Sequence, residues 1–276
     1  MEILAPAKIN LSFRIKGRRA DGFHEIESLM APVSLADRLT IERAGDDGRI
    51  RFSCDDPSLP VGDDNLVVRA ARVFQETTRI SAGLRIVLEK KVPHGAGLGG
   101  GSSDAASTLL GLNELFTTGL DATKLLQLGA QLGSDVPFFI VRSPAMCRGR
   151  GEIVDPTNLP ARFELLLVKP AFGVPTPWAY GRWKDSREIP GVDYSPQELG
   201  GVRFVNDLER PVFEKYVFLA YLKTWLREQP GVGAALLSGS GSTVLAVLRE
   251  SADGESLAAL VRQKLDSSLW TQLCAT

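Results

Sequence analysis

The most informative stretch of this 276-residue sequence reads Pro93-His-Gly-Ala-Gly-Leu-Gly-Gly-Gly-Ser-Ser-Asp-Ala-Ala106. Five of the seven residues from Gly95 to Gly101 are glycine, and apolar residues recur at helical spacing directly afterwards. Glycine lets the backbone take positive φ and approach a ligand closely, and Ser102, Ser103 and Asp104 are residue types that cap helices. Free N–H groups at the positive end of a helix bind anions. The stretch therefore predicts a loop that holds the phosphates of a nucleotide.

Other kinds of glycine loop fit less well. A Walker loop ends in Gly-Lys-Ser/Thr, whereas Gly101 is followed directly by Ser102. Gly95, Gly97 and Gly100 match G-x-G-x-x-G, but a dinucleotide fold also needs a strand that ends in an acidic residue about 20 residues later. Residues 121–132 predict a helix instead. A flexible linker is disfavoured because strand and helix patterns flank the loop.

Composition points to a globular enzyme of one or two domains. Lys and Arg number 32 and Asp and Glu 33, so the net charge of −1 argues against a nucleic-acid partner. The three cysteines, Cys54, Cys147 and Cys274, suit neither a disulfide framework nor a zinc site, which predicts a reducing, cytoplasmic location. No apolar run approaches 18 residues, so neither a membrane span nor a membrane partner is expected.

The apolar periodicity predicts an α+β fold in two domains, residues 1–157 and 158–276, separated by a Pro- and Asn-rich segment. Strands are predicted at 9–15, 23–30, 38–43, 49–53, 84–88, 163–168 and 243–248. Helices are predicted at 65–77, 104–116, 122–132, 211–228 and 251–265. The aromatic segment 175–180 is expected to be irregular.

Three polar residues outside the loop suit phosphoryl transfer. Strand alternation places Lys8 and Asn10 on one face, and Asp135 follows a predicted helix end. Each one alone is typical of an exposed strand position or a turn. Beside a phosphate loop, they supply a carboxylate that accepts a hydroxyl proton and a lysine that offsets charge. Phosphoryl transfer needs little more than such positioning and charge stabilisation.

Aromatic residues in both halves suit recognition of a base. Phe23 and His24 follow a predicted turn, and Thr176 and Tyr180 lie in the aromatic segment. Aromatic rings sandwich a base, and an adjacent polar side chain can bind its edge. Packing in a core is the simpler interpretation of the same rings in isolation.

The glycine loop resembles the second motif of the superfamily of galactokinase, homoserine kinase, mevalonate kinase and phosphomevalonate kinase, and Ser238-Gly-Ser-Gly-Ser-Thr243 resembles its third. Within it, the chain resembles the kinases that act on 4-diphosphocytidyl-2-C-methyl-D-erythritol in non-mevalonate isoprenoid biosynthesis. The stretches that carry this resemblance are 5–11, 18–24, 64–66, 132–137, 149–152, 175–177 and 206–209. They follow the family's order along nearly the whole chain.

The resemblance implies a fold and an acceptor site. It implies an N-terminal domain like the second domain of a small-subunit ribosomal protein, and a ferredoxin-like C-terminal domain. Asp135 would be the catalytic base for the 2-hydroxyl, with Lys8 between that hydroxyl and the γ-phosphate. The residues implied to bind the cytidyl acceptor are Asn10, Phe23, His24, Thr176 and Tyr180. Phe23 departs from the tyrosine usual in the family, which keeps the stacking surface and loses a hydroxyl.

The resemblance also implies ATP as phosphoryl donor. The residues implied to hold ATP are Pro93, His94, Gly95, Ala96, Gly97, Leu98, Gly99, Gly100, Gly101, Ser102 and Ser103 at the phosphates, Lys90 close to them, and Asn65 and Leu66 at the adenine. Mg²⁺ is expected because kinases use it to neutralise phosphate charge, although no carboxylate stands out as its ligand and no metal-binding residue is assigned.

Three other interpretations stay open at this point. The acceptor could be homoserine, a sugar or mevalonate; the chain could be a nucleotide sensor without activity; or it could transfer hydride from a dinucleotide. The presence of both Lys8 and Asp135 argues against the sensor. The expected partner is a small molecule, and the expected state is a monomer or a weak homodimer.

Overall fold

A computed structural model describes all 276 residues. The strands are β1 Glu2–Arg18, β2 His24–Arg43, β3 Ile50–Cys54, β4 Leu84–Glu89, β5 Ala145–Gly149, β6 Ile153–Pro156, β7 Glu164–Lys169, β8 Gln197–Leu199, β9 Val202–Asn206, β10 Val232–Leu237, β11 Val244–Leu248 and β12 Trp270–Ala275. The helices are α1 Leu66–Thr78, α2 Gly100–Leu115, α3 Ala122–Leu132, α4 Val136–Val141, α5 Thr176–Arg182, α6 Glu209–Lys215, α7 Val217–Arg227 and α8 Gly254–Lys264. This mixture confirms the α+β class.

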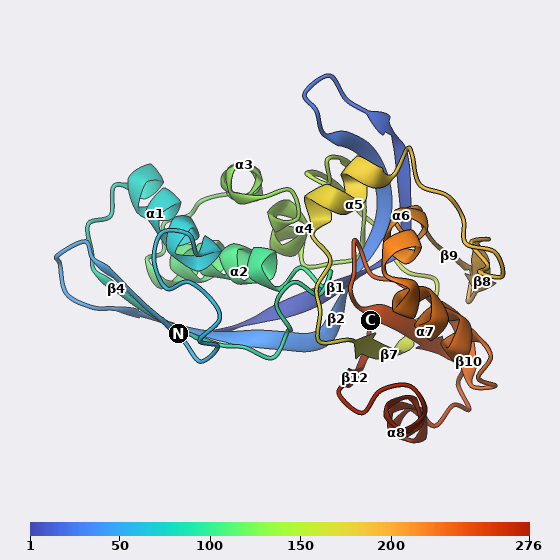
Figure 1. The fold of residues 1–276 in the computed structure, drawn as a ribbon. Coiled ribbons are helices and arrows are strands. Elements are labelled where there is room, and N and C mark those ends of the chain that lie inside the picture. The colour runs from blue at the N-terminus through green and yellow to red at the C-terminus, as the bar shows by residue number, and fades with distance from the viewer.

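The larger sheet has eight strands and is built around the long antiparallel pair β1 and β2. Its main path runs β3-β4-β2-β1-β9-β8, and β5 and β6 extend it from β2. Helices α1 to α4 lie together on one side of this sheet (Figure 1). They bury a core with β2 and β4 that includes Phe74, Leu109 and Phe138. This core fixes α2, and with it the glycine loop, over the middle of β1.

The smaller sheet has four antiparallel strands in the order β10-β11-β7-β12. In chain order these are its second, third, first and fourth strands, and helices separate the first from the second and the third from the fourth. That arrangement is ferredoxin-like, as the resemblance implied. Strand β9 also pairs in parallel with β1 of the larger sheet, where Ser12 is opposite Val205. The second half of the chain thus contributes β8 and β9 to the larger sheet, and the predicted division at residue 157 stays a prediction.

Several predicted elements have different bounds in the structure. Segments 23–30 and 38–43 belong to the single strand β2, because the residues between them are mostly buried and β2 stays paired with β1 on either side of the irregularity at 33–35. Segment 211–228 forms two helices, since the backbone leaves helical geometry at Tyr216 (φ −105°, ψ 66°). Segment 175–180 was expected to be irregular, but its residues from Thr176 onward belong to helix α5. Pro177 lies in the first turn of that helix, where the missing N–H of proline costs no hydrogen bond within the helix. The sequence analysis missed β5, β6, β8, β9, β10, β12 and α4.

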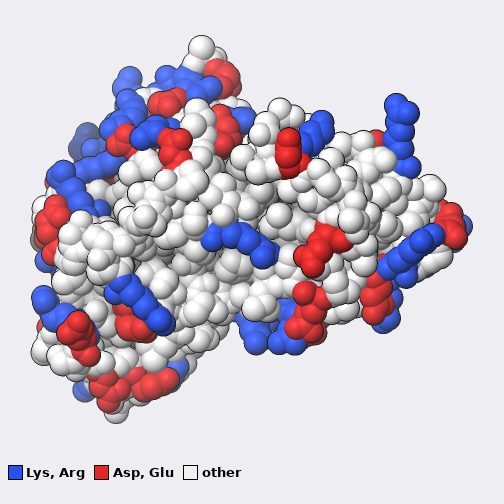
Figure 2. Space-filling model, turned by 180° about the vertical axis from the view of Figure 1, so that it is seen from behind, with Lys and Arg blue, Asp and Glu red and all other residues white.

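The face seen from behind carries charges of both signs. Lys and Arg lie among Asp and Glu on the rear face, with large uncharged areas between them (Figure 2). None of the helices is both long and apolar enough to cross a membrane. The three cysteines are free thiols, and burial raises the pKa of Cys147 and Cys274 to about 12.

Candidate active site

A single cleft of about 1370 Å³ gathers the residues that the sequence analysis singled out. All but two of them line it, and the two that do not are Leu98 and Ser103. Leu98 is buried in the apolar core and contributes through its backbone, because its carbonyl accepts a hydrogen bond from the Lys8 N–H at 2.9 Å. Ser103 is fully buried and its hydroxyl has no partner. Neither side chain is therefore available to a ligand in the cleft.

The glycine loop depends on left-handed backbone at three positions. Gly95, Gly97 and Gly99 have φ of +62°, +76° and +70°. At Gly97 a Cβ atom would lie 2.1 Å from the carbonyl oxygen of Ser238, so only glycine allows the third-motif loop to approach here. The two glycine-rich loops are thus packed backbone to backbone.

Helix α2 begins at Gly100, four residues before the predicted start at Asp104. The prediction that Ser102, Ser103 or Asp104 caps it was wrong: the capping position is Gly99, and no side chain makes a capping hydrogen bond. The first N–H groups of a helix lack acceptors within it. Here they stay free for an anion, and Gly100, Gly101 and Ser102 line the cleft at that end.

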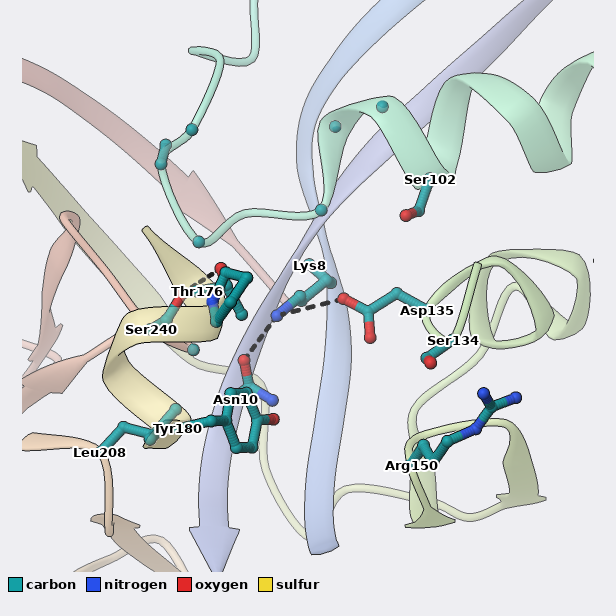
Figure 3. Close-up of a pocket in the computed structure, with 18 of the residues that line it drawn as sticks. Lys8, Asn10, Ser102, Ser134, Asp135, Arg150, Thr176, Tyr180, Leu208 and Ser240 are labelled. Carbon is teal, nitrogen blue, oxygen red and sulfur yellow. Dashed lines mark hydrogen bonds and ion pairs between the residues drawn. The ribbon is translucent and has the colours of Figure 1, made fainter. Parts of the chain in front are cut away.

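Lys8, Asn10 and Asp135 come together in the middle of the cleft (Figure 3). The Lys8 ammonium donates to Asn10 Oδ1 at 2.6 Å and lies 3.8 Å from Asp135 Oδ2. Asn10 Nδ2 donates in turn to Ser28 Oγ on β2 at 2.8 Å. Lys8 and Asn10 are 4% and 1% exposed, so they are not ordinary exposed strand residues. The pairing of β1 with β2 is irregular on both sides of these two residues, as is common where strands present functional side chains.

Lys90 lies beneath the start of α2 in a buried ion-pair cluster. Its ammonium contacts the carboxylate of Asp37 and lies 2.9 Å from Asp104 Oδ2. Burial raises the pKa of the Asp104 carboxyl. Burial alone would lower the pKa of Lys90, but the two carboxylates raise it above its usual value. The ammonium is also close to the loop, since a Cβ on Gly100 would lie 3.3 Å from it.

Aromatic rings line the opposite end of the cleft. The rings of His24 and Tyr180 lie 5.3 Å apart, and Trp183 meets His24 edge-on at 6.0 Å. Burial and the charge of Arg18 lower the pKa of His24, so its imidazole is neutral near pH 7. Phe23 is 51% exposed.

Two residues of this region did not stand out in the sequence. The Arg150 guanidinium lies 4.7 Å above the Phe23 ring. Ser240 of the third-motif loop shares a 2.7 Å hydrogen bond with the Thr176 hydroxyl (Figure 3). Both lie in motifs quoted above, and the position of the motif was the available signal. Asp37, by contrast, lies within β2 and carried no signal.

The residues expected at the adenine lie at the start of α1. Asn65 caps that helix, with Oδ1 accepting from the Val67 N–H at 2.9 Å and Nδ2 donating to the Pro60 carbonyl at 2.8 Å. Its amide is therefore occupied by structural bonds on both sides. Leu66 packs close to Gly101 of the glycine loop, within 3.7 Å of where a Cβ would lie.

Two family models match the chain. The one described as "GHMP kinases N terminal domain" matches residues 65–143, and "GHMP kinases C terminal" matches residues 197–267. The first covers the glycine loop, α2 and Asp135, and the second covers the third-motif loop.

Relatives named "4-diphosphocytidyl-2-C-methyl-D-erythritol kinase" resemble nearly the whole chain. The protein of Methylacidiphilum infernorum (isolate V4) is 46% identical over 88% of this chain and 84% of its own length. The protein of Syntrophotalea carbinolica is 41% identical over 97% of this chain and 95% of its own.

Solved structures agree. One titled "Crystal structure of 4-(cytidine 5'-diphospho)-2C-methyl-D-erythritol kinase" is 35% identical, covers all of both chains and has a TM-score of 0.80. A homoserine kinase from Cytophaga hutchinsonii ATCC 33406 shares the fold, with a TM-score of 0.68 at 16% identity over all of this chain and 94% of its own. With its two glycine-rich loops packed together against Lys8, this chain belongs to the GHMP kinases and, within them, to the 4-diphosphocytidyl-2-C-methyl-D-erythritol kinase family.

Proposed function

We propose that this chain transfers the γ-phosphoryl group of ATP to the 2-hydroxyl of 4-diphosphocytidyl-2-C-methyl-D-erythritol, yielding ADP and the 2-phosphate for isoprenoid precursor synthesis. The observation that carries the proposal is the position of Lys8 and Asp135. They lie 3.8 Å apart in one cleft, between a phosphate-binding helix start and an aromatic end that suits a base. Both substrates would reach the same pair of side chains from opposite ends.

The reaction then follows from three groups of this chain. The Asp135 carboxylate takes the proton of the acceptor hydroxyl while the oxygen of that hydroxyl forms a bond to the γ-phosphorus. The bond between that phosphorus and the oxygen bridging to the β-phosphate breaks, and ADP leaves with that electron pair. The Lys8 ammonium, held by Asn10, offsets charge on the phosphoryl group during transfer, and the free N–H groups at the start of α2 hold the remaining phosphates.

The aromatic end would select the acceptor. Phe23 and Tyr180 offer stacking surfaces, and the neutral imidazole of His24 can both donate to and accept from the edge of cytosine. The Thr176 hydroxyl, bonded to Ser240, lies beside them. The Arg150 guanidinium, which covers the Phe23 ring, adds a positive charge suited to the diphosphate of such an acceptor.

Magnesium is proposed to enter with the nucleotide as part of the MgATP substrate. Nowhere does the chain bring three His, Cys, Asp or Glu side chains together as a metal site. Magnesium is commonly bound through substrate phosphates and one or two carboxylates. The carboxylate available at this end is Asp104, which lines the cleft and whose buried Oδ1 lacks a hydrogen-bond partner. A cytoplasmic location and a monomeric or weakly dimeric state belong to the same proposal.

The test is ADP release from MgATP with the cytidyl acceptor, beside the same acceptor without its cytidyl group and beside homoserine. Turnover confined to the cytidyl compound is expected. Turnover with homoserine or the truncated acceptor instead would keep the kinase and overturn the acceptor. Bound ATP without turnover on any acceptor would overturn the activity.

A further inference from the structure

Asn206 ends strand β9 and reaches the third-motif loop at residues 238–243. Its side chain is 4% exposed, and both N–H donors of the amide and one of the two lone pairs of its oxygen are used within the protein. Nδ2 donates to the carbonyls of Leu237 and Gly239, each at 2.7 Å. Oδ1 accepts from the Leu208 N–H at 2.9 Å, at the start of α6. One side chain thus fixes both the end of β10 and the first turn of the loop.

A neighbouring side chain holds the same segment from the other direction. Glu209 Oε1 accepts from the Leu237 N–H at 2.9 Å, and its Oε2 is paired with Lys223 at 2.6 Å. The N–H and the carbonyl of Leu237 are therefore both bound by the segment 206–209. This segment was among the stretches that carried the family resemblance, and the proposed chemistry assigns it no role.

The loop that Asn206 fixes touches the reacting residues directly. Gly239 has φ +55°, and a Cβ there would lie 3.3 Å from Lys8 Nζ and 3.4 Å from Asn10 Oδ1. The next residue, Ser240, bonds to Thr176. A displacement of Gly239 would therefore change the space around the ammonium of Lys8.

We infer that Asn206 is a positioning residue for phosphoryl transfer: by holding the carbonyls of Leu237 and Gly239 it keeps the third-motif loop against the Lys8–Asn10 pair. Misplacing reacting groups by about 1 Å can lower a rate about 10²-fold. The effect should appear in kcat, because Asn206 does not line the cleft itself and acts through Gly239, which lies beside the Lys8 ammonium. The inference rests on the proposed function for its kinetic test.

The chain offers a matched control in Gln197. It lies on β8, is 7% exposed, and its amide bonds Ala235 of the same strand β10, donating to the carbonyl at 2.9 Å and accepting from the N–H at 2.8 Å. Gln197 thus stabilises β10 as Asn206 does but stops short of the loop. A purely structural contribution should be similar for both residues.

Asn206→Asp separates the two roles of Asn206 itself. A carboxylate still accepts from the Leu208 N–H but cannot donate to the two carbonyls. We expect Asn206→Asp to lower kcat by about 10–10²-fold with little change in KM for ATP. Gln197→Ala should keep a kcat close to that of the wild type, even if its melting temperature falls by as much as that of Asn206→Asp. Equal kcat in Asn206→Asp and the wild type, or equal losses in both variants, would overturn the inference.

Hydrogen–deuterium exchange tests the inference without activity. Amides of residues 238–243 should exchange faster in Asn206→Asp than in the wild type. In Gln197→Ala they should exchange at the rate of the wild type. If the wild type turns over none of the acceptors, the proposed function fails, while faster exchange in Asn206→Asp would still support the positioning role. Unchanged exchange in Asn206→Asp would refute that role even in an active enzyme.

Discussion

Gly99 of the glycine loop packs directly onto the side chain of Lys8: a Cβ at position 99 would lie 3.0 Å from Lys8 Cγ. The same Cβ would meet the Phe139 ring at 2.8 Å, and the backbone at Gly99 is left-handed. The residue that ends the phosphate loop and the lysine proposed to act on the phosphate are thus held in contact. Packing as well as charge therefore fixes the position of Lys8 relative to the glycine loop.

Gly99→Ala is expected to lower both stability and turnover. Left-handed backbone costs a non-glycine residue about 1–2 kcal/mol, and overpacking adds about 1–3 kcal/mol. Because the added methyl displaces Lys8, kcat should fall as well. Gly119→Ala is the control, since Gly119 has φ +67° with no neighbour within 4 Å of its Cβ position and lies outside the cleft. Urea denaturation and steady-state kinetics measure both quantities; a Gly99→Ala enzyme as stable and active as Gly119→Ala would contradict the packing argument.

Asp135→Asn is expected to lower kcat by about 10²–10⁴-fold, the usual contribution of a positioned base. The side chain makes no capping bond to α4, so the amide should preserve the fold. Asp155→Asn removes a carboxylate from an exposed ion pair with Arg148 and serves as control. Single-turnover rates at saturating substrates measure the chemical step. Near-normal turnover in a folded Asp135→Asn enzyme would remove Asp135 from the role of base.

The two histidines of the chain are expected to affect different substrates. His24 lies at the aromatic end of the cleft and His94 in the glycine loop. His24→Ala should raise KM for the cytidyl acceptor much more than KM for ATP, whereas His94→Ala should spare the acceptor. Each variant is thus the control for the other. Equal changes in both KM values for His24→Ala would argue against recognition of the base by His24.

The pKa of His24 predicts a pH dependence of stability. Burial, and then the charge of Arg18, lower this pKa below the value of about 6.5 expected in the unfolded chain. At about pH 6.5 and below, the unfolded chain therefore binds more protons at His24 than the folded protein does. The stability associated with neutral His24 is present above about pH 6.5 and is lost as the pH falls from that value through the lowered pKa of the folded protein. The melting temperature should therefore drop more in the wild type than in His24→Gln between about pH 7.5 and 5.5. Equal drops in melting temperature in the wild type and in His24→Gln would show that the pKa of His24 is the same in the folded and the unfolded protein.

Local pattern was enough to predict the elements that form the site's frame. The alternation around Ile9 to Ile15 predicted β1, and the glycine run predicted the loop that leads into α2. The start of α2 was misplaced because side-chain caps are visible in a sequence, whereas a backbone start at a left-handed Gly99 is not. Helix α5 was missed because proline and aromatic residues disfavour a helix locally, and here packing overrides that preference.

What depended on tertiary contact was not visible. The cluster of Asp37, Lys90 and Asp104 joins residues of β2, the segment after β4 and α2, which no spacing along the chain connects. Arg150 over Phe23 joins a turn after β5 to the tip between β1 and β2. The parallel pairing of β9 with β1 likewise brings Asn206 beside Phe13 across more than half of the sequence. Family resemblance directed attention to these regions without giving their geometry.

The long ribbon of β1 and β2 carries Lys8 and Asn10 in its middle and Phe23 and His24 at its closed end. Pairing of Gly17 with Glu25 and of Arg18 with His24 closes that end. The residues proposed to select the acceptor and those proposed to transfer the phosphoryl group therefore lie on the same ribbon, several residues apart. Replacing only the segment that connects β1 to β2, between Arg18 and His24, would therefore change the acceptor that such a kinase binds and leave Lys8 and Asn10 in place.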